Sequence, residues 1–156
     1  MADWMQPARE ALLSAADDDW ERALVASTEL VKHGYVGVTS AMQAWVDTVT
    51  AAAGGVVPQT FQFRDDNDPD PDARQSLDEM PPETLWAGRW FVARAAMDRD
   101  MCEALLGALP PRGIGAATTA VLNVCAATLR ALLQGHTVMQ MATLGADGVL
   151  RPVRRG

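Results

Sequence analysis

Apolar residues recur at three- and four-residue spacing along most of the chain, the pattern of amphipathic α-helices. In the first third, the spacing predicts a short helix over 7–16 and a second helix that follows the acidic run Asp17 to Asp19 and stops at Gly34. A third helix is expected to start at Thr39 or Ser40 and to stop at Gly54.

The second helix has a recognisable start and a buried side. Asp18 followed by Glu21 resembles a capping box for it. The buried stripe expected for that helix is Trp20, Ala23, Leu24, Ser27, Leu30 and Val31.

The second half of the chain predicts two longer helices. The first runs from Glu83 to about Leu109, and the second, Ile114 to Gln134, is closed by Gly135. The second holds a single formal charge, Arg130, in twenty-one residues of mostly Ala, Thr, Val and Leu. A helix that is apolar nearly all round is a membrane span or the centre of a helical core. The small residues, the threonines and the inserted arginine favour the core of a soluble domain, so no membrane partner is expected.

Two segments break the helical pattern. Residues 56–82 are acidic and interrupted by prolines, so we expect a loop, with one short strand over Thr60 to Arg64. Near the end, alternation in Val138 to Leu144 and Val149 to Val153, around a Gly-rich turn, predicts a C-terminal β-hairpin.

The expected fold is therefore mainly α, a compact bundle of four to five helices in a single domain. It consists of a helical hairpin at 18–54, the acidic loop at 56–82, a second helical hairpin at 83–135 and a C-terminal hairpin or tail at 136–156. The two helical hairpins follow a similar plan, with acids, a glycine link, threonines and a glycine stop in the same order. Their separation drifts from 78 to 81 residues, whereas a true repeat has a fixed period.

The expected oligomeric state depends on how far one chain can bury the apolar helix. Four or five helices barely suffice to surround Ile114 to Gln134 on every side. A second subunit would supply the missing cover, so we expect a homodimer.

Composition agrees with a globular chain and limits its partners. The 156 residues are 49% hydrophobic and 21% charged, which suits one folded domain. The formal charge of −7 disfavours binding to phosphate backbones, so no nucleic-acid partner is expected. Twelve of the thirteen basic residues are Arg, a bias typical of a GC-rich bacterial genome. Met1 to Arg9 lacks the pattern of a signal peptide, which favours the cytoplasm.

The acidic loop contains one metal-site candidate. Asp68, Asp70 and Asp72 alternate with prolines, and Glu79 falls at the twelfth position, as in a calcium-binding loop. Ala73 stands where that loop needs glycine. A solvated acidic loop is the simpler explanation, and calcium is the only cofactor that the sequence suggests.

Catalytic motifs are missing from the sequence. His33 and His136 are its only histidines, and each lies beside a glycine that is expected to end a helix. Cys102 and Cys125 lie among Ala and Leu, as buried free thiols do. A nucleophile elbow, a phosphate-binding loop and a zinc-binding His motif are all absent from the sequence, which therefore favours a protein that is not an enzyme.

One helical stripe is the best candidate for a binding surface: Trp86, Trp90, Arg94, Met97 and Met101. Large adaptable side chains of this kind are enriched where proteins meet, although packing in the core is the simpler explanation for the tryptophans. Arg94 lies in a mostly apolar stretch, so an ion pair with Asp98 one turn later is expected. The leading hypothesis is a cytoplasmic interaction module, such as an adaptor, assembly factor or small regulator. A binder of an apolar small molecule in the helical core comes second, and a small enzyme with a His placed by the tertiary fold comes third.

Overall fold

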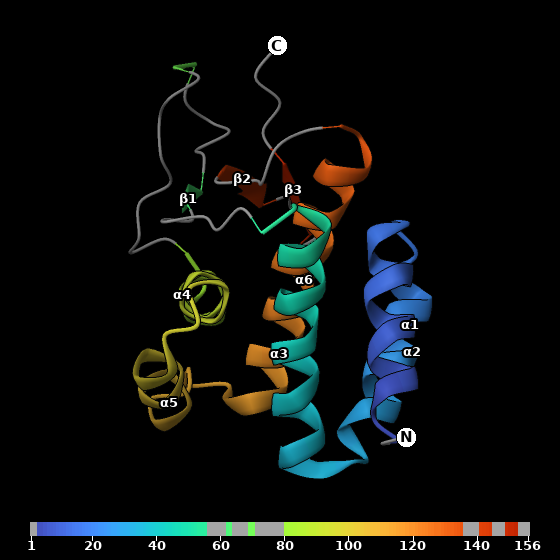
Figure 1. Cartoon of the computed structure of the whole chain (residues 1–156), viewed down its shortest axis with the longest axis vertical. Coiled ribbons are helices and arrows are strands. Elements are labelled where there is room, and N and C mark those ends of the chain that lie inside the picture. The colour runs from blue at the N-terminus through green and yellow to red at the C-terminus, as the bar shows by residue number, and fades with distance from the viewer. Residues whose placement is uncertain are drawn as a thin grey trace.

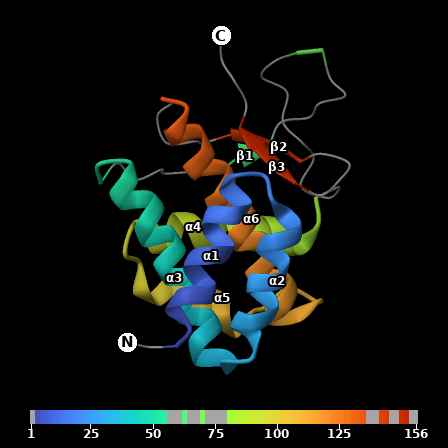
Figure 2. The ribbon, with the colours of Figure 1, turned by 90° about the vertical axis from the view of Figure 1, so that its right-hand side faces the viewer.

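The computed structural model describes residues 3–55, 62–63, 69–70, 80–135, 141–144 and 149–152, and this part of the chain is mainly helical, as predicted. The helices are α1 (Met5–Ala16), α2 (Trp20–Val31), α3 (Gly34–Ala52), α4 (Pro82–Ala95), α5 (Arg99–Gly107) and α6 (Gly113–Leu133) (Figure 1). They lie in three layers: α3 and α6 are in the middle, α1 and α2 cover one side, and α4 and α5 cover the other (Figures 1 and 2).

The apolar helix is at the centre of this arrangement. α6 packs against α1, α3 and α4, and twelve of its residues are buried. Trp45 of α3 joins the middle layer to α1, because its Nε1 donates a hydrogen bond to the backbone oxygen of Ala8 at 2.8 Å. Within the described residues, α6 alone is long and apolar enough to cross a membrane, and 61% of its most apolar window is buried in the protein. A buried core helix passes the same test, so this resemblance to a span is weak evidence for one.

The chain itself covers much of α6. We expected it to leave part of this helix open for a second subunit. α1, α3, α4 and the strand β3 (Leu150–Pro152) contact the helix, while Leu133 near its end stays 73% exposed. Asn123 of α6 holds this strand, since its Oδ1 accepts a hydrogen bond from the Leu150 backbone N–H at 2.9 Å. The homodimer stays a prediction.

Two predicted helix boundaries are wrong for local reasons. α3 starts at Gly34 rather than at Thr39 or Ser40, because Gly34 takes a left-handed backbone (φ +76°) and starts the new helix directly. The helix predicted from Glu83 to about Leu109 is two helices, α4 and α5. Met97 separates them with a left-handed backbone (φ 56°), which ends one helix before Asp98 caps the next.

Three short strands make a small sheet beside α6. β1 (Gln62–Phe63) lies within the strand predicted over Thr60 to Arg64 and pairs in parallel with β2 (Met141–Leu144). β2 pairs antiparallel with β3, with Leu144 opposite Leu150. Most of the acidic loop and the turn expected at 145–148 lie outside the described residues.

The six helices form two units of the same design. We call α1 to α3 the first repeat and α4 to α6 the second repeat. Asp18 (φ 62°) and Met97 (φ 56°) take the same left-handed conformation between the first and second helix of each unit. Asp19 and Asp98 then cap the second helix, accepting hydrogen bonds from the backbone N–H groups of Arg22 and Met101.

The separation between matching features is constant. From Asp18 to Met97 and from Asp19 to Asp98 it is 79 residues, and left-handed Gly34 and Gly113 start the third helices at the same distance. Backbone hydrogen bonds match as well: Asp19 N–H donates to Ser14 O, and Asp98 N–H to Ala93 O, both at 2.9 Å. The drift of 78 to 81 residues estimated from the sequence thus becomes a single offset when the backbone is compared.

Candidate interaction surface

The structure divides the five residues of the predicted surface between the core and the exterior. Trp86 and Trp90 are 5% and 0% exposed and stack on each other, with ring centroids 5.5 Å apart. Trp86 Nε1 donates a hydrogen bond to the Leu105 backbone oxygen at 2.9 Å, which ties α4 to α5. The two tryptophans therefore pack in the core, the simpler of the two explanations for them, and are not accessible to a partner in this fold.

Met97 and Met101 are exposed, by 68% and 48%, at the junction of α4 and α5. A core pocket for an apolar small molecule formed by the predicted surface would need these methionines and the two tryptophans to line one cavity. Two of the four residues are instead in the packed core and two face outward, so they do not enclose a common chamber.

Arg94 has a different partner from the one predicted. Its Nε and an Nη hydrogen-bond to the two carboxylate oxygens of Asp47 on α3, at 2.9 and 2.8 Å. This hydrogen-bonded carboxylate raises the pKa of Arg94, against the opposing effect of partial burial. The predicted partner, Asp98, caps α5 instead.

Only Asp70 of the four candidate calcium ligands belongs to the described residues; Asp68, Asp72 and Glu79 lie outside them. In the part of the chain that the structure describes, no three acidic, His or Cys side chains group as a metal site would require. Calcium binding by the acidic loop stays a prediction.

The candidate catalytic groups give little support for an enzyme. His33 is exposed just before α3, and His136 lies outside the described residues. Burial raises the pKa of Cys125, and it also raises the pKa of Cys102, where nearby Arg94 acts in the opposite direction. Both thiols therefore stay protonated at neutral pH, and a protonated thiol is a poor nucleophile.

Exposed apolar side chains gather on the first repeat. Ten large apolar side chains are exposed among the described residues, and seven of them lie between Met5 and Val36. We call these seven the hairpin surface: Met5, Leu13, Leu24, Val25, Val31, Tyr35 and Val36. It follows the outer sides of α1, α2 and the first turn of α3, which form one face of the molecule in Figure 2.

On α2, the periodicity of the sequence misassigns two members of this surface. Ala23, Ser27 and Leu30 are buried as predicted, whereas Leu24 and Val31 are 49% and 55% exposed. Apolar residues cover more than half of the helix circumference, but only the inner side of α2 meets neighbouring helices, α1 and α3. The width of this apolar arc was the one signal in the sequence that could have indicated exposure.

The second repeat provides an internal comparison. At the positions 79 residues after Leu24 and Val25 it carries Glu103 and Ala104, both exposed on α5. At the position matching Val36 it carries Gly115. The same helical design thus folds without large apolar groups at these three places, so the fold does not require Leu24, Val25 and Val36 to be apolar.

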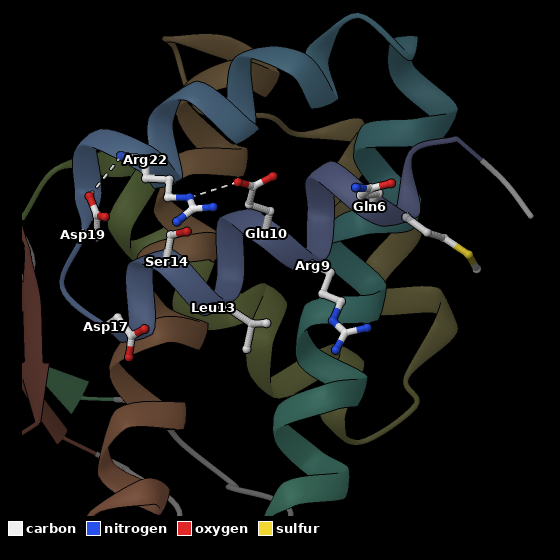
Figure 3. A pocket seen from close by; sticks show the side chains of 9 residues that line it. Gln6, Arg9, Glu10, Leu13, Ser14, Asp17, Asp19 and Arg22 are labelled. Atoms are coloured by element: carbon white, nitrogen blue, oxygen red, sulfur yellow. Dashed lines mark hydrogen bonds and ion pairs between the residues drawn. The ribbon is translucent and has the colours of Figure 1, made fainter.

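A groove runs along the outer side of α1, next to the start of α2 (Figure 3). Its volume is about 1050 Å³, and its apolar lining comes from Met5 and Leu13. Arg22 of α2 donates a hydrogen bond to Glu10 of α1 at 3.0 Å and bridges the two helices, while Arg9 projects on the other side of α1. With its open shape and mixed lining, the groove suits contact with another protein surface better than enclosure of an apolar ligand.

No protein-family model, curated protein or solved structure matches this chain.

Proposed function

We propose that this protein is a non-enzymatic protein–protein interaction module that uses the hairpin surface. The observation that carries the proposal is that, among the described residues, seven of the ten exposed large apolar side chains fall in one stretch of sequence, Met5 to Val36, which forms α1, α2 and the start of α3. Scattered single apolar residues are normal on protein surfaces, whereas a concentrated patch marks a contact site.

Two further features support this role. The second repeat folds with Glu103 and Ala104 at the positions that match Leu24 and Val25, so these two apolar groups of α2 serve a purpose other than folding. The groove on α1 places Met5 and Leu13 of this surface beside charged side chains, and many protein interfaces combine both kinds of group. Adaptors, assembly factors and small regulators all act through such surfaces.

A pair of matched variants tests the proposal. Val25→Asp places a charge on the hairpin surface, and Ala104→Asp places the same charge at the matching exposed position of α5. Wild type and both variants are used as bait in extracts of the source organism, with quantitative mass spectrometry. Each captured protein is then purified and its binding is reconstituted. Self-association is measured in parallel by light scattering.

We expect a specific partner, either another protein or a second copy, to bind wild type and Ala104→Asp and to be lost from Val25→Asp. One buried charge at an interface that cannot pair it is enough to reduce affinity at least tenfold. Equal binding by all three proteins, or no binding by any of them, would overturn the proposal.

A further inference from the structure

We infer that the partner at this surface is a second copy of the chain, with α2 of one copy lying antiparallel to α2 of the other. This inference rests on the proposed function and names its partner. The observation behind it is the order of residues along one ridge of α2: Glu21, Val25, Thr28 and Lys32. Their spacing of four, three and four residues places them on one side of the helix.

The ridge is acidic at one end and basic at the other, with Val25 and Thr28 between them. All four of its residues are exposed, and Leu24 and Val31 lie beside it. Glu21 and Lys32 are eleven residues apart, or about 16 Å along a helix axis. An antiparallel second copy therefore brings Glu21 opposite Lys32 at both ends, with the apolar residues between them.

The opposite orientation is unfavourable for the same ridge. A parallel copy would place Glu21 beside its own equivalent and Lys32 beside its own, so like charges would meet twice. Helix dipoles also favour antiparallel neighbours. The charge order thus selects both the partner, which must carry the same ridge, and its direction.

Both charged groups are available for this contact. Within the described residues Glu21 forms no ion pair, and its side chain is exposed on the first turn of α2. Lys32 contacts Glu29 at 2.8 Å, but its side chain is 67% exposed and its ammonium group has three donors. It can accommodate a second carboxylate without breaking the first pair.

The second repeat again shows that the ridge is not a requirement of the fold. The matching positions there are Asp100, Ala104, Gly107 and Pro111, which provide neither an apolar middle nor a basic end. The ridge is confined to the repeat that carries the apolar surface.

The small area of this interface sets the expected affinity of the dimer. α2 is only twelve residues long, and Tyr35 and Val36 at the start of α3 extend the contact area. Such an interface belongs to the small class, below roughly 1,200 Å² in total, which is typical of weak and transient complexes. Self-association is therefore measured by analytical ultracentrifugation up to high concentration, about 1 mM, which corresponds to a binding free energy near −4 kcal/mol.

The first experiment reverses the charges. Glu21→Lys and Lys32→Glu are each expected to weaken the dimer about tenfold, because each variant replaces two attractions with two repulsions. The double variant restores both pairs with their signs exchanged, and we expect its dissociation constant to return to within about threefold of wild type.

Since Glu21 also favours the N-terminus of α2, Asp100→Lys serves as a matched control. It makes the same change in the first turn of α5, away from the ridge. We expect it to leave the dimer unchanged, and circular dichroism verifies that every variant is folded.

The second experiment tests the relative orientation of the two α2 helices by disulfide formation. Glu21→Cys and Lys32→Cys are prepared as separate proteins, and each is oxidised alone or mixed with the other. An antiparallel dimer brings the two new thiols within disulfide reach only across the mixed pair. We expect a covalent dimer in the mixture and little in either protein alone. Cys102 and Cys125 are buried and contribute little background.

The outcomes separate this inference from the proposed function. Recovery in the double variant and a disulfide in the mixture support the antiparallel dimer. A dimer that Val25→Asp disrupts, but that shows neither effect, overturns the antiparallel arrangement and leaves the interaction module intact. A chain that stays monomeric at about 1 mM overturns the second copy as partner, while loss of a different protein on Val25→Asp would still support the module.

Discussion

Asp47 of α3 and Arg94 of α4 form a two-point ion pair that joins the first repeat to the second, with N to O distances of 2.9 and 2.8 Å. The Arg94 side chain is only 24% exposed, and its planar guanidinium matches both oxygens of the carboxylate. The contact spans 47 residues of sequence.

Loss of this pair is expected to destabilise the fold. Asp47→Asn removes the charge but keeps the shape, and we expect it to lower the free energy of unfolding by about 1 kcal/mol, because half-buried Arg94 loses its counter-charge. Urea denaturation measures the change. Glu103→Gln is the control, since the pair between Glu103 and Arg99 is highly exposed and spans 3.5 Å. Equal effects of the two substitutions would show that the Asp47 pair has no special weight.

Arg130 is the only charged residue in the apolar central helix, and the structure explains its presence. Its guanidinium donates hydrogen bonds to the backbone oxygens of Ala15 and Ala16 at 3.1 and 3.0 Å, where α1 ends. A helix C-terminus has unpaired carbonyl groups and a partial negative charge, and both favour a cation there. Arg130 therefore connects the core helix to the end of α1.

Replacement of Arg130 by Met would keep most of the apolar stem and remove these bonds. We expect Arg130→Met to lower the free energy of unfolding by about 1 to 2 kcal/mol, the usual effect of losing charge-assisted hydrogen bonds in a half-buried site. Arg22→Met is the matched control, because Arg22 pairs with Glu10 on the surface and is 67% exposed. If thermal or urea unfolding shows no difference between the two variants, this role of Arg130 is refuted.

Local sequence predicted much of the helical content because periodicity depends only on neighbouring residues. It failed where the backbone reverses without a typical stop residue. Met97 is a good helix former, so nothing in its chemistry announces the break between α4 and α5. Gly34 was expected to end a helix, yet its left-handed backbone lets the next one start at once.

The candidate surface was harder to predict than the fold. Periodicity shows which residues share a face of a helix, but it does not show how many neighbours cover that face. Leu24 and Val31 were therefore expected to be buried, and for Trp86 and Trp90 a binding surface and core packing were both open. The partner of Arg94 depends on how α3 and α4 pack, which no spacing along one helix reveals.

The break at Met97 leads to a prediction about stability. A left-handed backbone is unfavourable for residues with a side chain, by about 1 kcal/mol, and Met97 is 68% exposed, so little packing offsets this cost. Met97→Gly is expected to raise the free energy of unfolding by about 0.5 to 1 kcal/mol. Asp18 takes the same conformation in the first repeat, but Asp tolerates it better than Met does.

Asp18→Gly is therefore the matched comparison and should gain less than Met97→Gly. Its gain is reduced further because Asp18 also lies 3.6 Å from Arg130. Chemical denaturation of both variants gives the two differences directly. A loss of stability in Met97→Gly would mean that the exposed methionine makes contacts that outweigh its backbone strain.

Burial of Cys125 makes the stability of the protein depend on pH. Cys125 is fully buried, and burial raises its pKa above the ordinary value of 9.0. In the unfolded chain the thiol ionises near that value, so unfolding releases a proton at alkaline pH. The contribution of Cys125 to stability is thus complete below pH 9.0 and is lost as the pH rises above it.

We expect the free energy of unfolding to fall more steeply above pH 9.0 in wild type than in Cys125→Ala, which has no thiol to ionise. The difference between the two slopes, rather than the absolute stabilities of the two proteins, is the measured quantity, because the alanine also leaves a small cavity.

Modification by a thiol reagent tests the burial of both cysteines in a second experiment. The reagent should modify Cys102, which is 8% exposed, slowly in the native protein, and Cys125 only in denaturant. Rapid modification of Cys125 without denaturant would show that α6 opens readily and is not the closed centre of the fold.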